Sequence, residues 1–188
     1  MARPKSEDRR KAILSATTAL IAEQGLGAPT AEIAARAGIP HGSVFTYFET
    51  KAGLFNALYQ ELTTELTDAV VAAISPEADT RTQFEQLWSA WTRWGTSNPD
   101  KRRAQAQLNI SDLVTTEIRD AAYAYAAPVF ALIRRAGATG PLKDAPIRYA
   151  GALVSSCAAT TIEFMLRDPK RARVLCRTGL ETVWHALH

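Results

Sequence analysis

The residues best suited to chemistry in this 188-residue chain gather between positions 41 and 51. His41, Ser43, Tyr47 and Lys51 carry groups that can hydrogen-bond to phosphates or base edges, and the ring of Phe45 is suited to contact with a thymine methyl. Such groups recognise a nucleic acid only if a rigid element holds them on one surface. The surrounding sequence must therefore supply that element.

The segment from residue 30 to residue 51 predicts two short helices joined by a tight turn. Thr30 is suited to cap a helix over residues 31–37, and a second helix is expected over residues 40–48. Gly38 can take the positive φ that the turn between them needs. This pattern is typical of a helix-turn-helix, which seats its second helix in the major groove of DNA.

Residue spacing predicts which side of the second helix faces outward. Val44 and Phe48 lie four positions apart, so they share a face and are expected to pack into a core. The exposed strip then consists of His41, Gly42, Phe45 and Thr46, with Ser43 and Tyr47 on the opposite shoulder. The alternative is a helix pair that serves only packing, and the exposed aromatic rings beside Lys51 argue against it.

The elements that position this strip are expected to be helical throughout, because alanine is abundant and no alternating apolar and polar stretch predicts a strand. We expect an all-α fold of about nine helices, divided into a helix-turn-helix domain over residues 1–50 and a bundle over residues 51–188. The expected helices cover residues 6–23, 31–37, 40–48, 51–75, 79–98, 100–110, 111–136 with a bend at Pro128, 146–166 and 169–187. The expected capping residues are Ser6, Thr30, Thr50, Asp79 or Thr80, and Asp168.

The formal charge of +3 is concentrated at the N-terminus. The first eleven residues hold five basic and two acidic side chains, so the rest of the chain is balanced. This basic arm, with Arg3, Lys5, Arg9, Arg10 and Lys11, is either a tail that contacts phosphates or a solvated terminus.

The sequence offers no sign of catalysis, metal binding or export. The three histidines match no metalloprotease motif, and no nucleophile elbow or phosphate loop occurs, so we expect neither an enzyme nor a cofactor. The two cysteines form no metal-ligand or disulfide pattern. No signal peptide is recognisable, and the charge-free run 149–162 is too short to span a bilayer, so a soluble cytoplasmic protein is expected.

The region around the helix-turn-helix resembles the tetracycline-repressor (TetR) family of transcriptional regulators. The match runs in unbroken register over about residues 9–58 and is far more specific than a generic helix-turn-helix pattern. The residues that carry it are Arg10, Ile13, Leu14, Gly25, Thr30, Ile33, Ala34, Ala37, Gly38, Ile39, the run 42–48, Lys51, Leu54 and Ala57. Over the rest of the chain, the likeness is limited to size and helical layout.

The resemblance implies a role for individual residues of this chain. Phosphate contacts fall on Thr30, Ser43, Tyr47 and Lys51, and base reading falls on His41, Gly42 and Phe45. Ala31 lies where some members of the family have a longer base-reading side chain, and Thr46 is a further candidate DNA-binding residue. Two residues depart from the family pattern. Phe45 replaces the usual Tyr and loses a hydroxyl contact, and Pro40 replaces a capping side chain, so the target sequence is not predicted.

Aromatic residues cluster on the helix expected over residues 79–98. Phe84, Trp88 and Trp91 fall at spacings of four and seven positions, so they share a face. They either fill the bundle core or line a pocket for an apolar or aromatic small molecule, and the family resemblance implies a ligand pocket here. The candidate ligand-binding residues are Phe84, Trp88, Trp91, Asn109 and Tyr123.

The last two expected helices carry stripes of apolar and small residues that are typical of close helix packing. Either helix could be buried within one protomer, but the family resemblance implies a four-helix interface between two copies. The candidate interface residues are Leu153, Cys157, Thr160, Phe164, Cys176, Leu180, Val183 and Leu187. A dimer also pairs two recognition helices on a palindromic site.

The sequence therefore predicts a ligand-responsive, DNA-binding transcriptional regulator. The expected partners are a palindromic operator in double-stranded DNA, a second copy of the chain and a small apolar or aromatic effector, with no membrane. The alternative is a small-molecule binding protein with weak or vestigial affinity for DNA.

Overall fold

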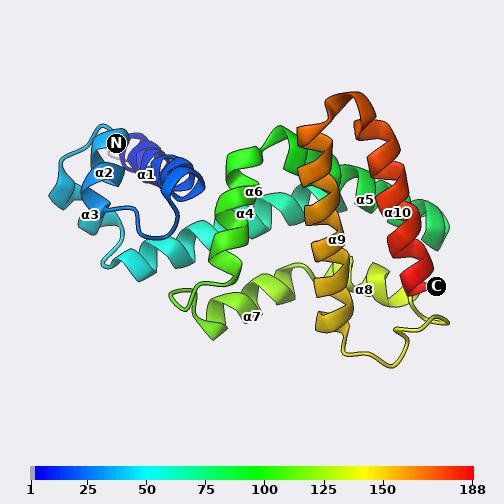
Figure 1. The fold of residues 1–188 in the computed structure, drawn as a ribbon. Helices are drawn as coiled ribbons and strands as arrows, with labels where there is room; N and C mark the ends of the chain where they lie inside the picture. The colour runs from blue at the N-terminus through cyan, green and yellow to red at the C-terminus, as the bar shows by residue number, and fades with distance from the viewer. Residues whose placement is uncertain (1–2) are drawn as a thin grey trace. The chain divides into compact units, whose positions relative to one another are not determined.

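The computed structural model describes residues 3–188, and the side chains from residue 6 onward. Over this range the chain forms ten α-helices and one short 3₁₀ helix, with no strand, which confirms the all-α prediction (Figure 1). The elements are α1 (Arg3–Gln24), α2 (Thr30–Arg36), α3 (His41–Tyr47), α4 (Lys51–Val71), α5 (Thr80–Ser97), α6 (Pro99–Asn109), α7 (Thr116–Tyr125), α8 (Ala127–Ala136), α9 (Ile147–Arg167), η1 (Pro169–Arg171) and α10 (Ala172–Leu187).

Several predicted helix ends are confirmed by their backbone geometry and hydrogen bonds. Gly25 and Gly38, which follow α1 and α2, both have positive φ, of 83° and 67°. The Thr50 hydroxyl accepts a hydrogen bond from the Gly53 N–H at the start of α4, at 2.9 Å. Asp79 caps α5, because its carboxylate accepts from the Thr82 N–H at 3.0 Å.

Other predicted caps were wrong. Ser6 lies inside α1, which begins at Arg3, and Thr30 is the first residue of α2, with Pro29 before it as an N-cap that makes no side-chain bond. Asp168 makes no capping bond either, because η1 intervenes before α10 begins at Ala172.

The region after α6 also differs from the prediction of a helix over residues 111–136. Residues 111–115 are not helical, and α4 ends at Val71 rather than at residue 75. The Arg119 guanidinium donates to the carbonyls of Asn109 and Ser111, at 2.7 and 2.8 Å, and at 3.4 Å to that of Leu108. This bonding satisfies carbonyls that a continued helix would have used, and it comes from a side chain that sequence periodicity does not reveal.

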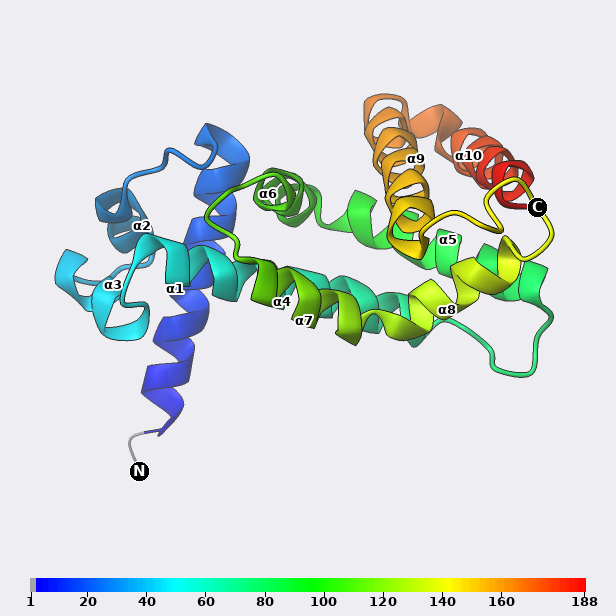
Figure 2. The same ribbon diagram turned by 90° about the horizontal axis from the view of Figure 1, so that it is seen from below.

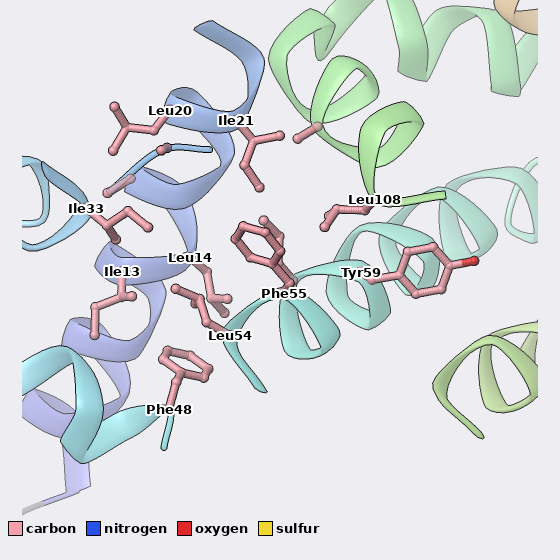
Figure 3. Packing of buried hydrophobic residues seen from close by; sticks show 14 of the residues in the cluster. Ile13, Leu14, Leu20, Ile21, Ile33, Phe48, Leu54, Phe55, Tyr59 and Leu108 are labelled. Atoms are coloured by element: carbon pink, nitrogen blue, oxygen red, sulfur yellow. The ribbon is translucent and has the colours of Figure 1, made fainter. Parts of the chain in front are cut away.

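The chain forms two compact units, of which the first contains Met1–Thr63 and Pro99–Ala122. Its core joins α1, α2, α3, the first part of α4, and α6, with side chains that interlock in Figure 3. The labelled core residues are Ile13, Leu14, Leu20, Ile21, Ile33, Phe48, Leu54, Phe55, Tyr59 and Leu108. This core holds the inner faces of α2 and α3 in place. The functional division at residue 50 stays a prediction.

The second unit contains Thr64–Asn98 and Tyr123–His188. Its core is built on α5, α8, α9 and α10, and α9 and α10 run side by side in both Figure 1 and Figure 2. Gly179 of α10 permits the close packing on α5, because a Cβ placed there would lie 2.7 Å from Cζ2 of Trp88.

By length and composition alone, α9 is apolar enough to cross a membrane. Its apolar side is used within the second unit, since Ala150, Val154, Ala158 and Ile162 are buried. One side of α9 therefore packs into the core of the second unit, although only 33% of its apolar window is buried.

Candidate functional site

The turn between α2 and α3 is fixed by backbone hydrogen bonds. The N–H groups of Gly38 and Ile39 donate to the carbonyls of Ala35 and Ala34, at 3.2 and 3.1 Å, so they satisfy the end of α2. At the start of α3, the Ser43 N–H donates to the Pro40 carbonyl at 2.9 Å. The missing side-chain cap at Pro40 therefore does not prevent the helix from forming.

The predicted orientation of α3 is confirmed. Val44 and Phe48 are 1% and 6% exposed and belong to the first core, whereas Phe45 is 42% exposed. His41, Gly42 and Thr46 are exposed as well, so the four residues of the predicted strip lie on the outer face. The rings of His41 and Phe45 meet edge to face, with centroids 5.7 Å apart.

The starts of α2 and α3 lie together at one end of this outer face. Oγ1 of Thr30 lies 3.2 Å from Nε2 of His41, so a candidate phosphate-contacting residue and a candidate base-reading residue share a hydrogen bond. The next residue, Ala31, is exposed. This contact fixes the His41 side chain beside the Phe45 ring.

Ser43 and Tyr47 are half-buried, which agrees with their predicted place on the shoulder of α3. Lys51 is also half-buried, and its Nζ donates to the Ala28 carbonyl at 2.8 Å and lies 5.4 Å from the centre of the Phe55 ring. An ammonium has three hydrogens, so this bond leaves two donors for another acceptor.

Some basic side chains near the helix-turn-helix are engaged within the first unit. Arg10 lies over the Phe48 ring at 5.5 Å, and its guanidinium is 3.7 Å from the Glu61 carboxylate. Arg36 donates to Glu23 at 2.7 Å, and this hydrogen bond lowers the pKa of the Glu23 carboxyl.

In the predicted basic arm, Arg9 and Lys11 are exposed. Residues 1 and 2 and the side chains of Arg3 and Lys5 lie outside what the structure describes. The role of this arm stays a prediction.

The candidate ligand-binding residues are not all gathered in one place. Phe84 and Trp88 are fully buried in the second core, where the Trp88 indole donates to the Cys176 carbonyl at 2.9 Å. Trp91 is half-buried against the same core. Tyr123 is half-buried and lies under the Arg148 guanidinium at 4.2 Å. Asn109 is exposed and belongs to the first unit.

Of these five residues, Trp88 lines a cavity of about 390 Å³ between α5 and α10. Sequence reasoning missed the arginines of this cavity, Arg93, Arg173 and Arg177. The last two lie four positions apart on one helix face, a spacing that could have suggested a shared site.

The candidate interface residues divide by burial. Leu153, Thr160 and Phe164 are exposed on α9, and Cys157, Cys176 and Leu180 are half-buried. Val183 and Leu187 are 3% and 1% exposed, because they pack into the core of their own protomer. Because these two side chains have almost no exposed surface, the prediction that they contact a second protomer was wrong.

Two large apolar residues on the same helices escaped the sequence analysis. Tyr149 of α9 is 55% exposed and Val174 of α10 is 65% exposed. Val174 begins an outward stripe on α10 that continues through Thr178 and Thr182, and the repeat of four positions was the available signal.

Comparison with known proteins finds a family model described as "Bacterial regulatory proteins, tetR family", which matches residues 13–58. The matched segment contains α2, α3 and most of the first core. It therefore covers the exposed strip described above.

Two curated relatives are similar over parts of the chain. The HTH-type transcriptional regulator BetI of Cronobacter sakazakii is 38% identical over 80 residues, which span 42% of this chain and 40% of that protein. The BetI protein of Escherichia coli O45:K1 is 27% identical over 172 residues, with 75% of this chain and 88% of that protein covered.

A solved structure extends the likeness to the whole fold. The crystal structure of a tetR family transcription regulator from Shewanella sp. PV-4 is 28% identical to this chain, with a TM-score of 0.85. The alignment covers 95% of this chain and 97% of that one, so it includes both compact units.

Proposed function

The chain belongs to the TetR family of DNA-binding transcriptional regulators, and from that premise we propose that it acts as a homodimeric repressor on a palindromic operator. A small-molecule effector bound in the second unit releases it from DNA. The protein works in the cytoplasm, where the operator and the effector are both available.

One observation carries the proposal for DNA binding: α3 presents His41, Gly42, Phe45 and Thr46 outward while Val44 and Phe48 anchor it from behind. The Phe45 ring is 42% exposed, so it is accessible to a partner on the outer face of α3. In a major groove, the Phe45 ring contacts a thymine methyl, and His41 hydrogen-bonds to a base edge.

Phosphate contacts would hold α3 in the groove. Thr30 and Ala31 open α2, where free backbone N–H groups favour an anion. Ser43, Tyr47 and the two remaining donors of Lys51 extend this contact line along the shoulder of α3 and the start of α4. These contacts set position and salt dependence, whereas the outer strip of α3 selects the sequence.

The dimer is proposed to form through the outer faces of α9 and α10. Tyr149, Leu153 and Phe164 leave large apolar surfaces exposed on α9, and Val174 does so on α10. Small residues between them, among them Ala159 and Thr160, allow two helices to approach closely. Two copies then present two α3 helices to half-sites whose centres lie about 34 Å apart, or a multiple of that.

The response to the effector is proposed to pass through α4, which spans Lys51–Val71 and contributes to both compact units. A helix transmits displacement along its axis because its backbone is hydrogen-bonded throughout. An effector that moves α4 would change the separation of the two α3 helices in the dimer. Since the half-sites have a fixed spacing, a small change would weaken operator binding.

The test is a selection of bound duplexes from a random DNA pool, followed by a salt titration on the selected site. The proposal predicts an inverted repeat and a steep loss of affinity as salt rises, because each neutralised phosphate adds to the slope. A pool that yields no consensus, together with weak binding, would instead indicate a small-molecule binding protein with vestigial DNA affinity.

A further inference from the structure

The cavity between α5 and the start of α10 has a volume of about 390 Å³ and opens to solvent. Its lining comes from α5, the end of α9 and α10, all within the second unit. This volume lies in the range of ligand pockets, which run from about 300 to 1,000 Å³.

Three arginines line this cavity, and no carboxylate does. Arg93 comes from α5, and Arg173 and Arg177 come from α10. All three are exposed, and no ion pair with Asp or Glu is found for any of them among the described residues. Arg81, also on α5, differs because it pairs with Glu85 and Glu181. The lining is therefore positive without internal compensation.

Apolar side chains also line the cavity. Met165, Ala172 and Leu180 contribute aliphatic surface beside the buried Trp88. Two polar groups of the lining are already bonded, since the Trp88 indole donates to the Cys176 carbonyl and the Thr92 hydroxyl donates to the Trp88 carbonyl, both at 2.9 Å. This apolar part of the lining favours a hydrocarbon or aromatic body.

We propose that this cavity binds the effector and that the effector is an anionic amphipathic molecule, with an acidic head group on an aromatic or acyl body. The planar guanidinium groups of Arg173 and Arg177 hold the head group, because their paired N–H donors match the oxygens of carboxylates, sulfonates and phosphates. This inference rests on the proposed function and refines the small apolar effector that the sequence predicted.

The cavity adjoins the proposed dimer face of α10, so a bound ligand could alter that face. Arg173 lines the cavity, and the next residue, Val174, lies on the proposed dimer face of α10. Arg177 contributes to both surfaces. A head group that draws these arginines inward would shift α10 within the proposed dimer face, which would change the separation of the two α3 helices in addition to the movement of α4 proposed above.

The test compares two probes that differ mainly by one charge. 8-Anilino-1-naphthalenesulfonate carries the anion, and N-phenyl-1-naphthylamine has the same rings without it. We expect the wild-type protein to bind the sulfonate more tightly, and salt to weaken only that complex. The double substitution Arg173→Gln and Arg177→Gln should lower affinity for the sulfonate about tenfold or more and leave the neutral probe unchanged.

A matched control removes the same charge outside the cavity. Lys170→Gln and Arg171→Gln alter two exposed basic residues of η1 that do not line it, so sulfonate binding should stay at the wild-type level. Equal losses in both double variants, or equal affinity for both probes in the wild type, would overturn the proposal.

A thiol measurement places the probe independently. Cys176 lines the cavity and Cys157 does not, so in a Cys157→Ala background the sulfonate should slow the reaction of Cys176 with N-ethylmaleimide. An unchanged reaction rate at saturating probe would place the probe elsewhere and overturn the proposal.

Operator binding is measured separately on the same proteins. If the wild type binds its selected operator but shows no preference for the anionic probe, this inference fails while the proposed function stands. If no operator is selected yet the arginine-dependent binding occurs, the proposed function fails and the ligand site stands.

Discussion

Substitution of Phe45 by alanine separates recognition from stability, because Phe48 on the same helix offers a matched control. Phe45 is 42% exposed and Phe48 is 6% exposed. Full burial of a Phe side chain contributes about 1.5–3 kcal/mol, so loss of the partly buried Phe45 ring should cost about 1 kcal/mol of folding stability. Loss of Phe48 also leaves a cavity in the first core and should cost about 3–5 kcal/mol.

Although Phe45→Ala should change stability little, it should weaken binding to the operator more than binding to nonspecific DNA. Burial of one methyl group contributes about 0.8 kcal/mol, so Phe45→Ala should weaken operator binding roughly fourfold and relax the preference at one position of each half-site. Nonspecific DNA, which is held through phosphates, should bind Phe45→Ala almost as it binds the wild type.

The assay is a double-mutant cycle measured by fluorescence anisotropy. The operator is prepared with uracil in place of each thymine in turn, which deletes a single methyl group. At the position that Phe45 contacts, uracil should weaken binding of the wild type but not of Phe45→Ala, since the contact is already lost. Uracil effects that are the same in both proteins at every position would refute the assigned contact.

Three further predictions concern the dimer, the loop after α6 and acid stability. Val174→Glu should yield monomers with weakened operator binding and little change in the melting temperature. Val183→Glu should instead lower the melting temperature sharply, because Val183 is buried. Sedimentation measures the oligomeric state of both variants, and thermal melts measure their stability. Arg119→Met should cost about 1–3 kcal/mol, measured by urea unfolding, because three carbonyls around the end of α6 lose their donor. The hydrogen bond from the Thr82 N–H lowers the pKa of the Asp79 carboxyl in the folded state. The ionised carboxylate therefore adds stability above the unfolded pKa of Asp79, and this stability is lost as pH falls below about 4. In Asp79→Asn, the melting temperature should depend less on pH in this acid range.

The all-α fold class and the division of α3 into a buried and an exposed face were predictable, because both depend on interactions between residues close in sequence. Gly38 takes the positive φ that its position suggested, and the spacing of Val44 and Phe48 correctly predicted their burial. In each case the deciding interactions lie within a few residues along the chain, where helix periodicity and end signals apply.

The parts that escaped prediction depend on contacts between distant residues. The gap between α6 and α7 is stabilised by Arg119, which bonds to carbonyls eight to eleven positions earlier. The burial of Val183 and Leu187 depends on which side of α10 meets the second core, and an apolar stripe alone does not distinguish a protomer core from a dimer face.

The cavity shows the same limit of sequence reasoning. Trp88 was a candidate because of its type, but Arg173 and Arg177, which line the same cavity, come from α10, far along the chain from α5. Asn109 was included for its polar side chain and lies in the other compact unit. The aromatic cluster was visible in the sequence, whereas the charge beside Trp88 appears only once α5 and α10 are packed together.

Binding of α3 in the major groove of two half-sites can be tested by dimethyl sulfate footprinting of the selected operator. This reagent methylates guanine N7 in the major groove and adenine N3 in the minor groove, so it reports which groove α3 occupies. A dimer that reads the major groove through α3 should protect guanine N7 in two inverted half-sites, one helical turn or a multiple of it apart, and this protection should be lost in the Val174→Glu variant. Protection confined to adenine N3, or a single unrepeated site, would contradict a dimer that reads the major groove through α3.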